Sequence, residues 1–272
     1  MRGTESMKIY EILDEETRLS VGILLYYEKE KSCVIELEDD LDEWSAPFLF
    51  TAFVKKGIYT IPREFSFLWV RERVIPSGRQ NIQSILKTHK LKEYDEIKFL
   101  ELSRGKCSQD SLYIRKTDTL PDYVQSRQKT NLREAAILPD NRLLAFFQNG
   151  ETKVLSQEQL HSIPEMDKVL GNELLKSSGM IRADGYCFSF NNSIDIPAKT
   201  LYETGQTIPL TLDDIKALVQ NYTYDTSQAC TVLECSRQNI SHFVKTNKLQ
   251  PIKNNVNGNL FLKGDVDRMR RE

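Results

Sequence analysis

The chain has 272 residues and a formal net charge of −2. It is therefore not a uniformly basic nucleic-acid-binding protein, and any nucleic-acid contact must come from a local patch. A chain of this length accommodates two or three domains. No apolar run approaches the roughly 18–20 residues that a membrane helix needs, and no apolar segment follows the N-terminal charges as a secretion signal requires. The five cysteines are odd in number and form no Cys-x-x-Cys pair, which favours a reducing cytoplasm.

Residues 1–118 are predicted to form an N-terminal α+β domain, to which the sequence attaches no activity. Strands rich in Ile, Val, Leu and Tyr are expected at Lys8–Leu13, Leu19–Tyr27 and Ser32–Leu37. Helices are expected from Ser45–Pro47, from Pro62, and around Ile82, Ile85 and Leu86. The periodicity of Tyr94–Leu102 fits a helix or a strand and does not decide between them.

Two stretches of this domain carry opposite charge. The acidic run Glu36–Glu43 is predicted to be a solvated connection, with metal binding as the alternative. Between Arg63 and Lys92 there are seven basic residues and two acidic ones. This basic stretch fits a second nucleic-acid surface, and it equally fits docking against the acidic run or a partner. We favour the docking interpretation on sequence grounds.

A polar segment, residues 119–130 with Pro121, is predicted to be a linker. Residues 131–206 are predicted to form a small α+β module. The expected order is strand, turn, strand, turn and strand over Ala135–Leu155, then a loop with a short helix over Leu160–Leu175. Two further strands are expected around Asp184-Gly185.

Five short sequence motifs lie in or next to these expected elements: Leu138-Pro-Asp, Asn149-Gly-Glu, Asp184-Gly-Tyr, Ile194-Asp-Ile-Pro and Leu201-Tyr-Glu. In these motifs the module resembles the bacterial domain-of-unknown-function family numbered 2442. The resemblance implies a compact α+β fold, often found beside helix-turn-helix segments, and implies no catalysis. Asn191-Asn192 departs from the family pattern.

Residues 207–272 are predicted to contain two short helices, a hairpin and a last helix. Thr226 or Ser227 is expected to cap the first helix and Ser236 the second, because a side-chain oxygen there can accept from an orphan N–H. Apolar residues follow at helical spacing: Ala229, Cys230, Leu233, Ile240, Phe243 and Val244. The Asn-rich run Lys253–Asn259 suits a hairpin turn, Leu260–Leu262 its returning strand, and Asp265-Val266 the start of the last helix.

This order, with Ser227-Gln-Ala-Cys, Cys235-Ser-Arg-Gln-Asn-Ile and Asp265-Val266, resembles the excisionase/MerR-like winged helix family. The resemblance covers about the last fifty residues and implies DNA binding by the second helix and the wing. The charge of the region agrees, because Ser236–Gly264 contains five basic residues and no Asp or Glu.

The side chains expected to contact DNA lie on the second helix, after it and on the wing. They are Ser236, Arg237, Gln238, Asn239, Ser241, His242, Lys245, Lys248, Lys253 and Asn255. Arg suits the acceptors of guanine, and Gln or Asn suits adenine, in the major groove. Lysines suit phosphates, which supply affinity without sequence information.

The sequence contains no phosphate loop, no His-Glu-x-x-His and no Gly-x-Ser-x-Gly motif. The three histidines are far apart, so neither a metal nor a cofactor is expected. Cys230 and Cys235 are expected in the core of the small domain, with a redox pair as the alternative.

The sequence therefore predicts an α+β, multidomain, cytoplasmic bacterial protein that binds double-stranded DNA sequence-specifically, as a transcription regulator. A single winged module reads few base pairs, so we expect a homodimer. The alternative is a non-enzymatic adaptor or effector-binding protein that recruits its partner through the N-terminal domain. A third class, an enzyme, would need a pocket lined by Arg71, Arg73 or Arg79 with a facing carboxylate.

Overall fold

The computed structural model describes residues 7–209, 212–256 and 258–270. The chain divides into two compact units, one ending at Val124 and the other beginning at Gln125. We call them the N-terminal unit and the C-terminal unit. Both combine helices with antiparallel strands, which confirms the α+β prediction. Among the described residues no helix is both long and apolar enough to cross a membrane.

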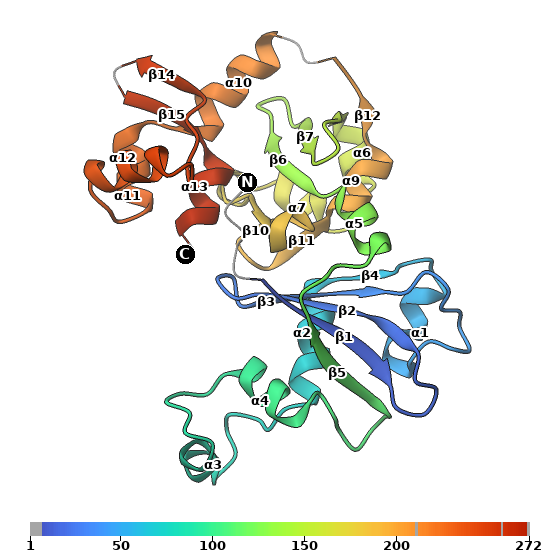
Figure 1. Ribbon diagram of the computed structural model, residues 1–272. Coiled ribbons are helices and arrows are strands. Elements are labelled where there is room, and N and C mark those ends of the chain that lie inside the picture. Colours follow the sequence, from blue (N-terminus) through green and yellow to red (C-terminus); the bar gives the residue numbers. More distant parts are fainter. Residues whose placement is uncertain (1–6, 210–211, 257, 271–272) are drawn as a thin grey trace. The chain divides into compact units, whose positions relative to one another are not determined.

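The N-terminal unit is built on a five-stranded sheet of order β4-β3-β2-β1-β5 (Figure 1). The strands are β1 (Met7–Asp14), β2 (Ser20–Tyr27), β3 (Ser32–Leu37), β4 (Thr60–Ile61) and β5 (Leu112–Thr117). The first three match the predicted strands to within one residue at every end, because runs rich in Ile, Val, Leu and Tyr are bounded there by charged turns. Tyr10, Leu24 and Ile35 from these strands enter one core with Phe50 and Trp69.

Four helices follow β3. They are α1 (Phe48–Val54), α2 (Arg63–Glu72), α3 (Ile82–Thr88) and α4 (Glu96–Ser103). The undecided run Tyr94–Leu102 is thus mostly helical, and its Asp95 side chain caps α4 by accepting from the Lys98 amide at 3.0 Å. The helix α2 begins just after Pro62, as predicted. The helix α1 begins at Phe48, three residues later than the predicted start at Ser45, because Pro47 is the N-cap and not part of the first turn.

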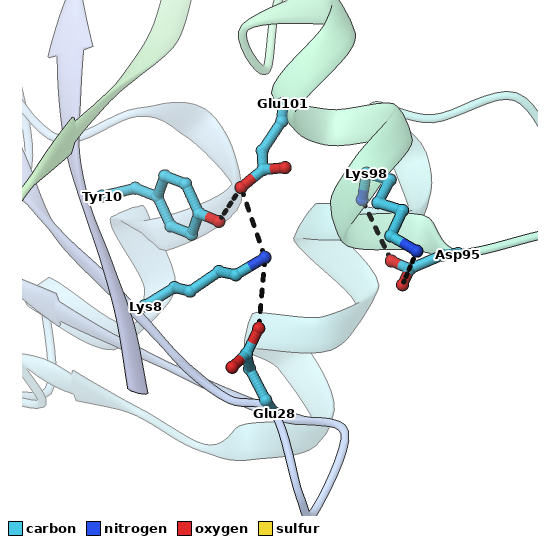
Figure 2. Close-up of polar contacts among 6 residues, drawn as sticks. All are labelled: Lys8, Tyr10, Glu28, Asp95, Lys98 and Glu101. Atoms are coloured by element: carbon cyan, nitrogen blue, oxygen red, sulfur yellow. Dashed lines mark hydrogen bonds and ion pairs between the residues drawn. The ribbon is translucent and has the colours of Figure 1, made fainter. Parts of the chain in front are cut away.

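A partly buried polar network connects α4 to the sheet (Figure 2). The Tyr10 hydroxyl donates to Glu101 Oε1 at 2.6 Å. Lys8 Nζ lies between Glu28 Oε1, at 3.2 Å, and the same Glu101 oxygen, at 3.5 Å. Burial, together with the Glu101 carboxylate, raises the pKa of Tyr10 above its usual range, so the phenol stays a donor.

The helix α3 lies on an excursion of the chain between α2 and α4, and Figure 1 shows it extending away from the sheet. The excursion is closed at its base, because the Tyr94 hydroxyl donates to the Ile75 carbonyl at 2.7 Å. The Tyr94 ring also contacts Phe99 of α4, with centroids 5.3 Å apart. The excursion therefore begins just after α2 and ends just before α4, and these two points are joined by the hydrogen bond between Tyr94 and Ile75.

One sequence expectation for this unit is wrong in part. The acidic run was expected to be solvated along its length, but Glu36 is fully buried in β3 and accepts from Thr60 Oγ1 at 2.8 Å. Leu37 and Leu41 are buried as well. The solvated part is confined to the turn after β3, where Asp39, Asp40 and Asp42 are exposed.

The C-terminal unit begins within α5 (Asp122–Gln128), inside the segment predicted to be a linker. One sheet has the order β12-β8-β7-β6, from β6 (Leu132–Ile137), β7 (Leu143–Phe147), β8 (Thr152–Leu155) and β12 (Gln206–Thr207). A second has the order β11-β10-β9, from β9 (Met180–Arg182), β10 (Cys187–Phe190) and β11 (Ile194–Pro197). Phe147, Phe188 and Phe190 lie in their shared core.

Short helices connect these sheets. They are α6 (Gln157–His161), α7 (Met166–Leu170), α8 (Glu173–Ser177), the 3₁₀ turn η1 (Ala183–Gly185) and α9 (Ala198–Thr204). Sequence periodicity predicted one helix between Leu160 and Leu175 and two strands around Asp184-Gly185. Three short helices and three strands are present there, because five-residue elements are too short to show a period.

The last seven elements are α10 (Leu212–Tyr222), β13 (Thr223–Tyr224), α11 (Thr226–Val232), α12 (Arg237–Lys245), β14 (Lys253–Val256), β15 (Gly258–Leu262) and α13 (Lys263–Arg270). The strands form a sheet of order β13-β15-β14. Residues from α11, α12, β15, α13 and the turn after α12 build a small core: Ala229, Ile240, Leu249, Phe261 and Val266. A buried Glu134 in β6 accepts from the Gly264 amide at the start of α13 at 3.2 Å.

Candidate nucleic-acid interface

The start of α12 is fixed by a cap and by one buried side chain. Ser236 is the N-cap, and its hydroxyl accepts from the Asn239 amide at 3.3 Å, as predicted. Ile240 is only 1% exposed and anchors the helix in the core. Arg237, Gln238 and Asn239 therefore occupy the first turn with their side chains in solvent.

The opposite side of α12 is polar and positively charged. The side chains of Ser241, His242 and Lys245 are exposed, as is Lys248 in the turn after the helix. Phe243 and Val244 are half-buried against the core, as the helical spacing predicted. Because no Asp or Glu occurs from Ser236 to Gly264, no carboxylate from this stretch neutralises the exposed face.

Arg237 is oriented by Ser227, which the sequence offered only as a possible cap of the first helix. Its Nη2 donates to Ser227 Oγ of α11 at 2.9 Å. A guanidinium carries five N–H donors in a rigid plane, so one bond leaves the others available to a ligand. The bond links α11 to the exposed start of α12, and spacing along the chain gave no signal for it.

The turn between α11 and α12 closes in a Schellman motif. The Cys235 amide donates to the Cys230 carbonyl at 3.1 Å, and Glu234 has the left-handed φ of 50°. Cys230 and Cys235 are half-buried members of the small core. Burial raises the pKa of the Cys235 thiol, and the neighbouring Cys230 raises it further. Both effects reduce the thiolate that a redox pair would need.

The hairpin β14–β15 lies beside α11. Lys253 begins β14, pairs with Leu260 and is exposed. Gly258 has a φ of 105°, and a Cβ there would come within 2.9 Å of Thr226 Oγ1, so both backbone and space favour glycine. The side chains of Asn254 and Asn255, and all of Asn257, lie outside the described residues.

Two details of this region differ from the sequence expectation. The cap of α11 is Asp225, one residue before Thr226, and it forms a capping box with Gln228. Lys263 was counted with the basic residues of the surface, but its Nζ donates to the Ser177 carbonyl at 3.1 Å. Lys263 therefore binds the chain's own backbone.

The enzyme alternative required a pocket lined by Arg71, Arg73 or Arg79 with a facing carboxylate, and among the described residues only Arg73 of these three pairs with a carboxylate. Arg73 is buried, pairs with Asp110, and places its guanidinium 4.0 Å from the Trp69 ring centroid. Arg71 and Arg79 are exposed. Among the residues that the structure describes, no group of three or more His, Cys, Asp or Glu could hold a metal ion.

A surface depression of about 1060 Å³ lies elsewhere in that unit, over β1, β5 and the end of α4. Four of its charged side chains form two ion pairs with one another. Lys106 Nζ lies 2.7 Å from Glu15 Oε1, and Arg115 Nε lies 3.0 Å from Glu11 Oε2.

Comparison of the chain with protein-family models, curated proteins and solved structures finds no match. The functional argument therefore depends on the geometry and charge of α11, α12 and the hairpin.

Proposed function

We propose that residues 207–272 form a winged helix-turn-helix that binds double-stranded DNA sequence-specifically, and that the chain is a bacterial transcription regulator. One observation carries the proposal. The exposed face of α12 presents Arg237, Gln238, Asn239 and Lys245, and the stretch from Ser236 to Gly264 contains no carboxylate. A helix with these side chains suits the acceptor-rich edges of the major groove and the phosphates beside it.

The residues divide into two roles. Arg237, Gln238 and Asn239 at the start of α12 contact base edges, where bidentate hydrogen bonds distinguish one base pair from another. Ser241, His242 and Lys245 lie one turn later and contact phosphates, as do Lys248 and Lys253. Ser227 supports the first group by orienting Arg237.

An adaptor role predicts a different surface. A helix used for protein assembly has no need to exclude carboxylates, and a charge-neutral α12 face would have favoured it. The face instead carries Arg237 and Lys245, followed by the exposed Lys248. DNA binding is therefore the better supported proposal, in a cytoplasmic protein, with partner or effector binding left to the N-terminal unit.

The test uses the full chain and fluorescence anisotropy. A random duplex library is first selected against the protein, and the selected site and a random duplex are then titrated at two salt concentrations. We expect Arg237→Ala to weaken binding to the selected site by about 1–3 kcal/mol and to relax base preference there. We expect Lys245→Gln to weaken both duplexes alike and to reduce the salt slope by about 1.

The matched control is Lys168→Gln, which removes an exposed lysine from α7 in the same unit. It should leave both titrations unchanged. If the wild-type chain binds no duplex at low salt, or if Lys168→Gln weakens binding as much as Lys245→Gln, DNA binding by α12 is refuted. Pull-down with the N-terminal unit as bait would then take priority.

A further inference from the structure

The sequence of α12 and of the turn after it has a counterpart in the N-terminal unit. Arg79–Leu91, which we call the α3 segment, aligns without gaps with Arg237–Leu249. The residues are identical at eight of thirteen positions, and both segments contain Arg-Gln-Asn-Ile followed by Lys-Thr-x-Lys-Leu. Such a match within one chain, over a stretch with no low-complexity bias, indicates an internal repeat.

The structure shows the same correspondence. At all thirteen positions the exposed residues of one segment align with exposed residues of the other, and the covered with the covered. Thr88 Oγ1 donates to the Ser84 carbonyl at 3.0 Å, and the aligned Thr246 Oγ1 donates to the His242 carbonyl at 2.9 Å.

The elements upstream repeat as well. Before the α3 segment, a Tyr-Thr pair leads into the two-residue strand β4, and the helix α2 follows. Before α12, a Tyr-Thr pair leads into the two-residue strand β13, and the helix α11 follows. The segments differ at their start. The residues Arg79–Asn81 form a turn, with the Ile82 amide donating to the Arg79 carbonyl at 3.0 Å, whereas Arg237–Asn239 are helical.

The repeated positions are mostly those in solvent. Six of the eight identical pairs are exposed in both segments, including the Arg, Gln and Asn at the start and both lysines. Two positions that pack differ, with Ile85 aligned to Phe243 and Leu86 to Val244. If packing alone explained the repeat, the covered positions would be the identical ones. The identical positions are mostly exposed, so the two segments share a surface. We infer that the two surfaces bind the same kind of ligand.

The charge of the α3 segment supports an anionic ligand. From Arg73 to Lys92 the chain contains no Asp or Glu, as in Ser236–Gly264. Arg79, Lys87 and Lys90 are exposed and form no ion pair with any residue that the structure describes. The docking against the acidic run that the sequence favoured is therefore not formed by these three cations.

We propose that the α3 segment is a second surface for double-stranded DNA, with Arg79, Lys87 and Lys90 contacting phosphates. The proposal rests on the DNA-binding function of α12, whose exposed side chains the α3 segment repeats. The hydrogen bond from Tyr94 to Ile75 closes the base of the excursion that carries this surface.

The experiment compares two aligned pairs of substitutions in the full chain. Lys87→Gln with Lys90→Gln tests the α3 segment, and Lys245→Gln with Lys248→Gln tests α12. Binding of a random duplex is followed by anisotropy over a salt series. Each pair should reduce the slope of log K against log salt by about 1.8, since each phosphate contact contributes about 0.9. Circular dichroism confirms that the variants fold.

Controls remove two exposed lysines from the same unit: Lys55→Gln with Lys56→Gln for the α3 segment, and Lys168→Gln with Lys199→Gln for α12. Lys55, Lys168 and Lys199 are each paired with a glutamate, so these controls test the loss of positive charge outside the two proposed surfaces. The controls should leave the slope unchanged. If only the α12 pair lowers the slope, the α3 proposal is overturned and the proposed function stands. If only the α3 pair does, this proposal is supported and the role of α12 is overturned. If neither does, both are overturned.

A second readout detects contact directly. Bromodeoxyuridine-substituted duplex is crosslinked to the full chain by ultraviolet light, and the attached peptides are identified by mass spectrometry. Crosslinks in the α3 segment support the proposal. Crosslinks confined to the last two helices and the hairpin overturn it, whatever the salt slopes show.

Discussion

Glu234 occupies the left-handed position of the turn between α11 and α12, with φ 50°. A side chain with a Cβ is strained there by roughly 1 kcal/mol, and glycine is not. We expect Glu234→Gly to stabilise the two helices by about 1 kcal/mol. Hydrogen exchange of the α11 and α12 amides measures this, because both tryptophans, Trp44 and Trp69, lie in the N-terminal unit and would not report it.

Glu234→Gln separates the strain of this residue from its charge. Glutamine keeps the Cβ and removes the negative charge from the edge of the basic surface. Both variants should bind duplex more tightly at low salt, whereas only Glu234→Gly should slow exchange. Faster exchange in Glu234→Gly would show that the left-handed residue is not a source of strain.

At the scale of the element, the start of α11 depends on a capping box. Asp225 accepts from the Gln228 amide at 2.8 Å, and Gln228 Oε1 accepts from the Asp225 amide at 2.9 Å. We expect Asp225→Ala to cost about 1 kcal/mol of helix stability and Asp225→Asn to cost little, because asparagine is an equally good cap. Exchange of the α11 amides measures both.

Ser227→Ala completes this comparison, because the sequence left Thr226 or Ser227 as the cap. The structure assigns Ser227 to Arg237 instead. The substitution should leave α11 exchange unchanged and weaken binding of the selected duplex. Fast α11 exchange in Ser227→Ala with normal exchange in Asp225→Ala would reverse the assignment of the cap.

Runs of β-forming residues between charged turns, prolines at helix starts and a capping serine predicted several elements. The first three strands, the helices after Pro47 and Pro62, and the cap at Ser236 all followed from local chemistry. Other features depend on distant partners. Glu36 is buried beside the hydroxyl of Thr60 on the neighbouring strand, and the buried Arg73 pairs with Asp110, which lies 37 residues further along the chain. No local pattern contains those contacts.

Some features of the candidate site could likewise be predicted from local sequence, and others could not. Its exposed residues could be named from the sequence, since a cap followed by polar residues and a buried Ile240 places them. The hydrogen bond from Arg237 to Ser227 could not, because it joins two helices across a turn. The repeat between the α3 segment and α12 is present in the sequence, but composition and hydrophobic period do not show it. Only a direct alignment of the two stretches does.

For the whole molecule the central quantity is the amount of DNA that one chain can contact. A single winged module buries about 600–1,000 Å², and specific complexes usually bury more. The deficit can be met by a second chain, as the homodimer prediction assumes, or by a second surface on the same chain. These two solutions differ in mass, which makes the homodimer directly testable.

We expect light scattering of the purified chain to give twice the 31.5 kDa of one copy, and the complex with the selected duplex to contain two chains. Lys87→Gln with Lys90→Gln should leave this mass unchanged, because exposed lysines in a DNA-binding surface do not join the copies. A complex with one chain and one duplex would contradict the homodimer. The α3 segment would then have to supply the contacts that a partner chain was expected to add, and its substitution should abolish specific binding.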